Sequence, residues 1–299
     1  QYLGTDGYYS DVLLTNNRLY ISGGNPVLAV FDLQLNKLTS MGEATDQYTR
    51  LATNGTSVFV AGTRPSDDGL RQEAQIRAYS IANNTKIWDR YLFDQNYWSY
   101  GLSVAAVGNK VFWSAQDGVD GRELYVSDGT TTTKLDINKI SGPSNPTELY
   151  AINGKLYFAA NDGMNGNELW VSDGGSVASG HTYMVNNINS TGNSDPKYMT
   201  LVGSLIYFSA DDATLGRELW VTDGVSLAVP ININTTAGMG SQPEELAACN
   251  GKLYFAANDG THGNEPWISD GNPVGMGTYM LKDIHTEDSN PHDFTVLGS

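Results

Sequence analysis

The sequence predicts an all-β protein, a β-propeller of about six four-stranded blades that occupies residues 1–299 as a single domain. Three observations support this prediction: a repeat of about 45 to 50 residues, a strand–turn–strand pattern within each repeat, and second strands that are apolar on both faces. No segment of comparable length shows an apolar period of 3.6 residues, so we expect helix to be scarce.

The repeat is clearest in residues 101–299, where four gap-free segments each end in Asp-Gly. These segments are residues 108–129, 153–174, 203–224 and 250–271. A second motif, Ser-x-Pro, recurs with the same period. Its four copies are Ser144 and Pro146, Ser194 and Pro196, Ser241 and Pro243, and Ser289 and Pro291. Residues 1–100 hold two divergent copies, at 17–23 and 55–62, which keep the turn and strand but lack the acidic loop. Together with the four clear copies, these give six copies of the turn-and-strand pattern.

The best copy predicts the strands of one unit. We expect strands at 148–152, 155–160, 168–172 and 182–185, with a hairpin turn at Asn153-Gly154, because both turn residues accept positive φ. Its second strand is apolar on consecutive residues, not on alternate ones. Such a strand belongs to a sheet that is covered on both faces, as in radially packed blades.

The two chain ends leave two arrangements open. Residues 291–299 have the pattern of an opening strand of a further repeat, although residues 11–15 already supply an opening strand at the other end. Either the last segment closes the ring against the first blade, or the chain is a stretch of a longer array.

The acidic composition disfavours some classes of binding partner. The formal net charge is −16 and the pI is about 4.4, so the surface repels phosphate backbones and anionic lipid headgroups. We therefore expect no nucleic-acid partner. No run of eighteen apolar residues occurs, which predicts no membrane insertion. The single cysteine, Cys249, is predicted to be a buried, inert thiol.

An acidic hairpin with the pattern Asp-Gly-x-x-Gly-x-Glu recurs in the later repeats. Its carboxylates could cap the hairpin's backbone amides while glycine supplies positive φ, or they could bind Ca²⁺, which prefers oxygen ligands. Recurrence in every late repeat favours the structural role, and Ca²⁺ is the one cofactor left open. The candidate metal ligands are Asp117, Glu123, Asp162, Glu168, Asp212, Glu218, Asp259 and Glu265.

Aromatic residues crowd the divergent segment that follows the second strand core. Tyr97, Trp98 and Tyr100 are candidates for stacking on sugar rings, since aromatic faces beside polar groups suit such ligands. Core packing between blades is the alternative.

Catalytic motifs are missing from the sequence. It contains no His-x-x-x-His, Gly-x-Ser-x-Gly, phosphate-binding loop or dinucleotide fingerprint. Paired carboxylates contributed by distant blades would leave no local spacing, so glycoside chemistry stays open.

Three units resemble a known repeat family. Residues 123–130, 168–174 and 218–224 are similar to the ELWxxDGT repeat of bacterial and archaeal extracellular proteins, while residues 265–271 depart from it by Pro266. The resemblance covers residues 101–299 and implies a propeller at the cell surface or outside the cell, often beside further domains of the same polypeptide. It favours a non-catalytic module for binding, adhesion or surface structure, with an extracellular protein or glycan as partner. The alternative is a secreted lyase or glycosidase acting on polysaccharide at the central channel.

Overall fold

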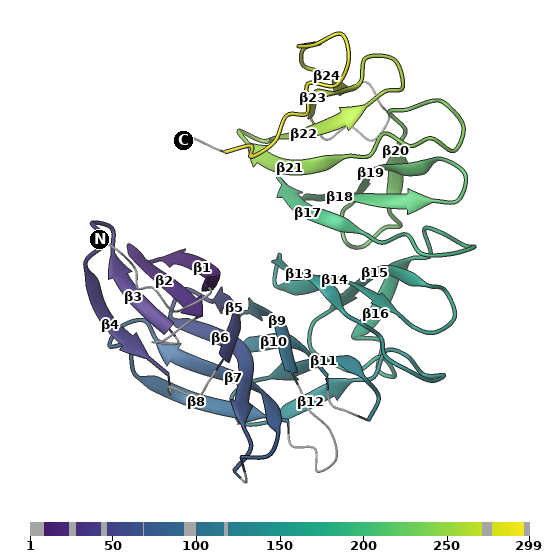
Figure 1. The fold of residues 1–299 in the computed structure, drawn as a ribbon. Coiled ribbons are helices and arrows are strands. Elements are labelled where there is room, and N and C mark those ends of the chain that lie inside the picture. Colours follow the sequence, from purple (N-terminus) through teal and green to yellow (C-terminus); the bar gives the residue numbers. More distant parts are fainter. Residues whose placement is uncertain are drawn as a thin grey trace. The chain divides into compact units, whose positions relative to one another are not determined.

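The computed structural model describes residues 9–23, 28–42, 47–67, 69–92, 100–116, 119–270 and 277–295. This part of the chain forms 24 strands in six four-stranded antiparallel sheets, and within each sheet the strands lie in chain order (Figure 1). The described residues contain no helix, as the sequence predicted. They therefore include no helix that is long and apolar enough to cross a membrane.

The first three sheets come from residues 9–135. Sheet 1 contains β1 (Tyr9–Thr15), β2 (Arg18–Gly23), β3 (Leu28–Asp32) and β4 (Lys37–Met41). Sheet 2 contains β5 (Gln47–Thr53), β6 (Ser57–Pro65), β7 (Gln72–Ser80) and β8 (Lys86–Tyr91). Sheet 3 contains β9 (Tyr100–Val107), β10 (Lys110–Gln116), β11 (Arg122–Ser127) and β12 (Thr132–Leu135).

The last three sheets come from residues 147–280. Sheet 4 contains β13 (Thr147–Ile152), β14 (Lys155–Asn161), β15 (Asn167–Ser172) and β16 (Thr182–Asn186). Sheet 5 contains β17 (Lys197–Val202), β18 (Leu205–Asp212), β19 (Gly216–Thr222) and β20 (Val229–Ile231). Sheet 6 contains β21 (Glu244–Cys249), β22 (Lys252–Asn258), β23 (Asn264–Ser269) and β24 (Thr278–Met280).

The chain divides into two compact units. The first comprises Gln1–Leu156 with Ser172–Thr182, and the second comprises Tyr157–Val171 with Tyr183–Ser299, so the boundary runs through sheet 4. The four strands of that sheet lie where the sequence predicted them, within one residue at each end. Its first turn has φ of +50° at Asn153 and +75° at Gly154, the backbone that an Asn-Gly hairpin requires.

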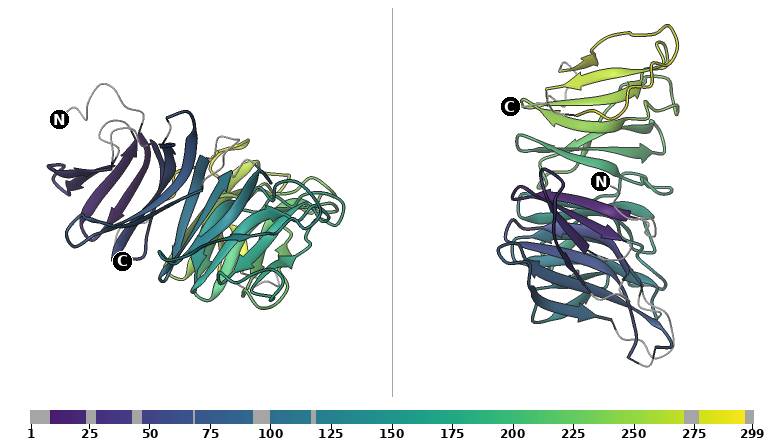
Figure 2. Two further views of the ribbon diagram at one scale, coloured as in Figure 1. Left: turned by 90° about the horizontal axis from the view of Figure 1, so that it is seen from below. Right: turned by 60° about the vertical axis from the view of Figure 1, so that its left-hand side comes forward.

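Within each unit, neighbouring sheets pack face to face. In the first unit, sheets 1, 2 and 3 lie face to face (Figure 2). Val58 and Val60 of β6 join a core with Tyr20 of sheet 1, while Phe59 on the opposite face joins a core with Trp113 of sheet 3. In the second unit, a shared core of sheets 5 and 6 includes Val221 and Phe255. This sandwiching explains the consecutive apolar residues of the second strands.

A distinctive backbone geometry precedes each opening strand of the later repeats. The residue before the proline of the Ser-x-Pro motif has positive φ in all four copies: +47° at Asn145, +42° at Asp195, +51° at Gln242 and +47° at Asn290. The residue two positions after the proline also has positive φ: +54° at Glu148, +59° at Tyr198, +57° at Glu245 and +57° at Asp293. Asn290 and Asp293 therefore repeat the two positive φ angles found at the openings of sheets 4, 5 and 6, in agreement with the repeat pattern.

The third strands of sheets 4, 5 and 6 each bury a tryptophan. Trp170 and Trp220 are 4% exposed and Trp267 is 8% exposed. Trp220 pairs across the strands with Phe208, as Trp267 does with Phe255, so the two positions are equivalent. Trp267 packs in the core that sheets 5 and 6 share.

Substitution of Trp170 by alanine is expected to lower the free energy of unfolding by about 3–5 kcal/mol, because it leaves a large cavity. Tyr183→Ala, on the neighbouring strand β16, is the matched control, since this tyrosine is 40% exposed. Urea denaturation of both variants measures the difference. Equal, small effects would show that the third strand does not carry the core.

Candidate functional site

A buried glutamate lies at the start of each third strand from sheet 3 onward. Glu218 of β19 is 0% exposed, and its Oε2 accepts hydrogen bonds from the Ser241 hydroxyl at 2.5 Å and from the Ile233 amide at 3.0 Å. Its Oε1 accepts from the Asn234 amide at 3.3 Å. The carboxylate thus ties the third strand of sheet 5 to the loop that leads into sheet 6.

The same anchor forms in every late repeat. Glu123, Glu168 and Glu265 are each 2% exposed or less, and each accepts a hydrogen bond from the hydroxyl of Ser144, Ser194 or Ser289 at 2.5 to 2.8 Å. In all three, the amide of that serine also donates to the carboxylate. The shared period of glutamate and Ser-x-Pro in the sequence was the signal for this contact, which the sequence analysis missed.

Burial and hydrogen bonding act in opposite directions on these carboxylates. Burial raises the pKa of Glu168 and of Glu218, although the serine and amide donors oppose it. At Glu265 burial again raises the pKa, but the donors Ile284 and Ser289 outweigh it and the pKa lies below its usual value. The serine of this anchor, Ser289, is only half-buried, whereas Ser194 and Ser241 are fully buried.

The hairpin aspartates cap their own turns. Asp162 Oδ1 accepts from the amides of Met164 at 2.9 Å and Asn165 at 2.8 Å. Asp212 and Asp259 make the equivalent pairs of bonds, at 2.7 to 3.0 Å. This is the hydrogen bonding that the structural interpretation of the hairpin predicts.

Each hairpin also rests against the loop that begins the next repeat. Gly216 has a φ of +78°, and a Cβ there would lie 2.8 Å from the Gly240 amide nitrogen. Gly263 has a φ of +81°, and a Cβ there would lie 2.5 Å from the Glu287 carbonyl oxygen. The second glycine of the motif is therefore required both by its backbone conformation and by this close approach.

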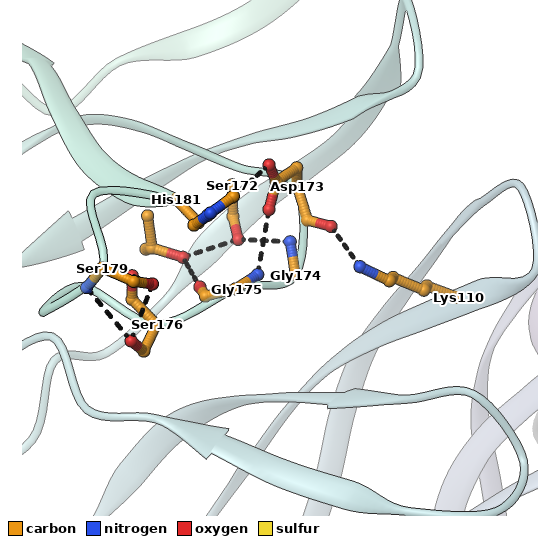
Figure 3. Close-up of polar contacts among 9 residues, drawn as sticks. Lys110, Ser172, Asp173, Gly174, Gly175, Ser176, Ser179 and His181 are labelled. Carbon is orange, nitrogen blue, oxygen red and sulfur yellow. Dashed lines mark hydrogen bonds and ion pairs between the residues drawn. The ribbon is translucent and has the colours of Figure 1, made fainter.

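A second turn that contains an aspartate follows each third strand, and in sheet 4 this turn makes additional side-chain contacts. Asp173 accepts from the Gly175 amide at 3.0 Å, and its Oδ2 lies 2.6 Å from His181 Nδ1 (Figure 3). The neighbouring Ser172 hydroxyl lies 2.7 Å from the Thr182 hydroxyl, and Lys110 Nζ donates to the Asp173 carbonyl at 2.7 Å (Figure 3). These contacts hold together the two ends of a loop, residues 174–181, in which Ser176, Ala178 and Ser179 are exposed.

The corresponding turn differs in sheet 5. Asp223 accepts from the amides of Val225 and Ser226, and donors within the turn hold its pKa below the usual value. Val225 and Leu227 are 89% and 70% exposed. A constant aspartate therefore supports loops of different length and chemistry in different repeats.

The residues with positive φ on the opening segments form a second variable set, here called the bulge row: Glu148, Tyr198, Glu245 and Asp293. The strand pairing shifts register between Lys197 and Thr200 and between Glu244 and Ala247, so Tyr198 and Glu245 lie in β-bulges. In the second unit two of these residues are in contact, because the Asp293 amide donates to Glu245 Oε2 at 3.2 Å. The row combines carboxylates with one tyrosine that is 37% exposed.

The remaining sequence-predicted residues have different outcomes. Tyr97, Trp98 and Asp117 lie outside the described residues, and Tyr100 begins β9 with a side chain that is likewise not described. The expectation that Cys249 is buried is wrong, because it is partly exposed at the end of the opening strand β21. Among the described ranges, no group of three or more His, Cys, Asp and Glu side chains is placed to hold a metal ion.

No protein-family model matches this chain, and no curated protein matches its sequence. Solved structures share its fold. The acylaminoacyl peptidase of Pyrococcus horikoshii is 12% identical, with a TM-score of 0.51 over 92% of this chain and 44% of its own. The Dos1 propeller is 14% identical, with a TM-score of 0.53 over 89% of this chain and 69% of its own. Dipeptidyl peptidase 4 of Porphyromonas gingivalis is 8% identical, with a TM-score of 0.60 over 96% of this chain and 48% of its own.

The chain thus spans about half the length of the two peptidases. At these identities the likeness shows the fold alone: six four-stranded antiparallel sheets with β-propeller neighbours.

Glu218→Ala is expected to lower the free energy of unfolding by about 3 kcal/mol or more, because it leaves two amides and a buried hydroxyl without their acceptor. Glu287→Ala, at an exposed position, should change it by less than about 0.5 kcal/mol. Urea denaturation compares the two variants. A Glu218→Ala protein as stable as the control would contradict the role of the anchor.

Asp162→Asn should destabilise the protein at neutral pH and lose this effect in acid. Partial burial raises the pKa of Asp162, but hydrogen bonds from Asn165 and Met164 outweigh it and hold the pKa below its usual value. The ionised form therefore contributes stability above the unfolded-state pKa, and this contribution disappears as pH falls through the folded-state pKa. Denaturation at pH 7 and at about pH 3 measures it, with Asp283→Asn as an exposed control. A penalty that is the same at both pH values would refute the linkage.

Proposed function

We propose that the protein is a non-catalytic binding module outside the cell, built as a six-bladed β-propeller, and that its ligand is a glycan held by the bulge-row residues of the second unit, Tyr198, Glu245 and Asp293. The extracellular location is favoured by the resemblance of residues 101–299 to the ELWxxDGT repeat. The glycan is favoured by the chemistry of the row, since carboxylates accept hydrogen bonds from sugar hydroxyls and an exposed tyrosine offers a face for stacking.

One observation carries the proposal: the repeat keeps the backbone of the bulge row constant while its side chains vary. Glu148, Tyr198 and Glu245 all have φ between +54° and +59°, a conformation that costs a non-glycine residue about 1–3 kcal/mol. Strain of this kind persists where the surrounding structure fixes it, and it concentrates at ligand sites. The Glu–Ser anchors and the proline turn provide that fixation here.

The supporting scaffold is separate from the variable groups. The anchor carboxylates accept hydrogen bonds from the loop leading into the next sheet, and the described hairpin aspartates accept them from their own turns. The row residues Tyr198 and Asp293 are exposed. A rigid scaffold that presents variable side chains is the usual design of a recognition surface.

The test is binding to a panel of immobilised glycans, followed by titration calorimetry with the best ligand. The variant Tyr198→Ala/Glu245→Gln is expected to weaken that binding at least about tenfold, the value of one well-placed contact. Tyr279→Ala, an exposed tyrosine on β24 outside the row, should bind as the unmodified protein does.

Two results would overturn the proposal. Binding that is unaffected by the row variant would move the ligand site elsewhere, and a panel without any bound glycan would reject the ligand class. Release of shortened oligosaccharides during incubation would replace the binding module with a polysaccharide-acting enzyme.

A further inference from the structure

The residue between the second glycine and the anchor glutamate alternates along the chain. It is arginine in the repeats of sheets 3 and 5 (Arg122 and Arg217) and asparagine in those of sheets 4 and 6 (Asn167 and Asn264). A charged side chain is therefore exchanged for a shorter neutral one at a fixed position of the repeat.

In sheet 5 the arginine meets oxygen atoms only. Arg217 Nη1 donates to the Asp195 carbonyl at 3.0 Å, to the Ser209 carbonyl at 3.3 Å and to the Ser209 hydroxyl at 3.4 Å. Nη2 donates to the Ser194 carbonyl at 3.3 Å. The guanidinium thus supplies both the donors and the positive charge that these acceptors need.

The backbone around Asn264 repeats that of sheet 5. Asn258 donates its amide to the Ser241 carbonyl at 2.9 Å, as Asp211 does to the Ser194 carbonyl at 2.7 Å. Asn258 pairs with Asn264 across β22 and β23, as Asp211 pairs with Arg217. By this correspondence, the carbonyls of Ser241, Gln242 and Ala256 in sheet 6 take the positions of the three carbonyls that Arg217 contacts in sheet 5.

Asn264 cannot serve these acceptors. Its Nδ2 donates instead to Glu244 Oε1 at 3.2 Å and to Asn290 Oδ1 at 3.4 Å. Its Oδ1 is shielded from solvent and makes no hydrogen bond with the described residues, and the same holds for Asn167. Turning the amide over would place Oδ1 against the Glu244 carboxylate, so the orientation is fixed. Sheet 5 thus has a guanidinium at this position, whereas sheet 6 has a neutral amide whose Oδ1 finds no donor among the described residues.

We propose that Asn264 Oδ1 and the adjacent backbone carbonyls bind a monovalent cation, Na⁺ or K⁺, which takes the place of the guanidinium of Arg217. A water molecule has only two hydrogens to donate, whereas one cation can be shared by Asn264 Oδ1 and several carbonyl oxygens at once. Carbonyl and amide oxygens are ligands for such ions, as in K⁺ channels. One nearby carboxylate matches a single positive charge better than Mg²⁺, which keeps most of its own waters.

The experiment measures melting temperature in choline chloride and in NaCl or KCl at the same ionic strength. The unmodified protein is expected to melt about 2–4 °C higher in one alkali salt than in choline, because the ion binds the folded form. The variant Asn167→Arg/Asn264→Arg carries its own guanidinium groups and should lose this dependence. Comparison of Na⁺ with K⁺ identifies the ion.

Two further variants keep the test independent of how well that double variant folds. Arg217→Asn should increase the dependence on the alkali cation, since it adds an equivalent site in sheet 5. Asp259→Asn, which removes the hairpin carboxylate of sheet 6, should leave the dependence unchanged. Equal melting temperatures in all three salts, or a dependence that the double variant retains, would refute the site. Stabilisation by millimolar Ca²⁺ alone would refute the monovalent assignment.

Discussion

The architecture of the late repeats depends on a buried carboxylate that accepts hydrogen bonds from the loop leading into the next sheet. Each anchor glutamate is desolvated, and an ionised group in that position is stable only when hydrogen bonds replace its water. The serine of the Ser-x-Pro turn and nearby amides provide those bonds. Because the donors lie in the loop that follows the fourth strand, the anchor fixes where the next sheet begins, and with it the strained backbone around the proline.

A division of labour between residues follows from this anchor. Positions that hold the backbone, such as Glu218 and Ser241, are the same from repeat to repeat, whereas Tyr198, Glu245 and the loop 174–181 differ in chemistry. The Asp173–His181 contact at the base of that loop follows the same rule. The aspartate occurs at this position in each late repeat, whereas the histidine occurs only in the repeat of sheet 4. The exposed side chains can therefore change without alteration of the fold.

Sequence patterns predicted the strands well and the contacts incompletely. Residues 155–160 were recognisable because a strand covered on both faces is apolar throughout, and the Asn153-Gly154 turn has few conformational alternatives. The partner of Glu168 was not predicted, because Ser194 lies 26 residues away and only the common period connects the two. The positive φ of Tyr198 left no local signal either, since tyrosine rarely adopts it and the surrounding turn imposes it.

The anchors also determine how the chain would respond to a pulling force. Each one joins the third strand of a sheet to the segment that opens the following sheet, as Glu123 does with Ser144 and Glu218 with Ser241. Consecutive repeats are thus linked in series by short covalent loops that are themselves clamped. Tension applied along the backbone must break a buried, charge-assisted contact before the next opening strand can separate from its sheet. The repeats are therefore expected to unfold one after another under force.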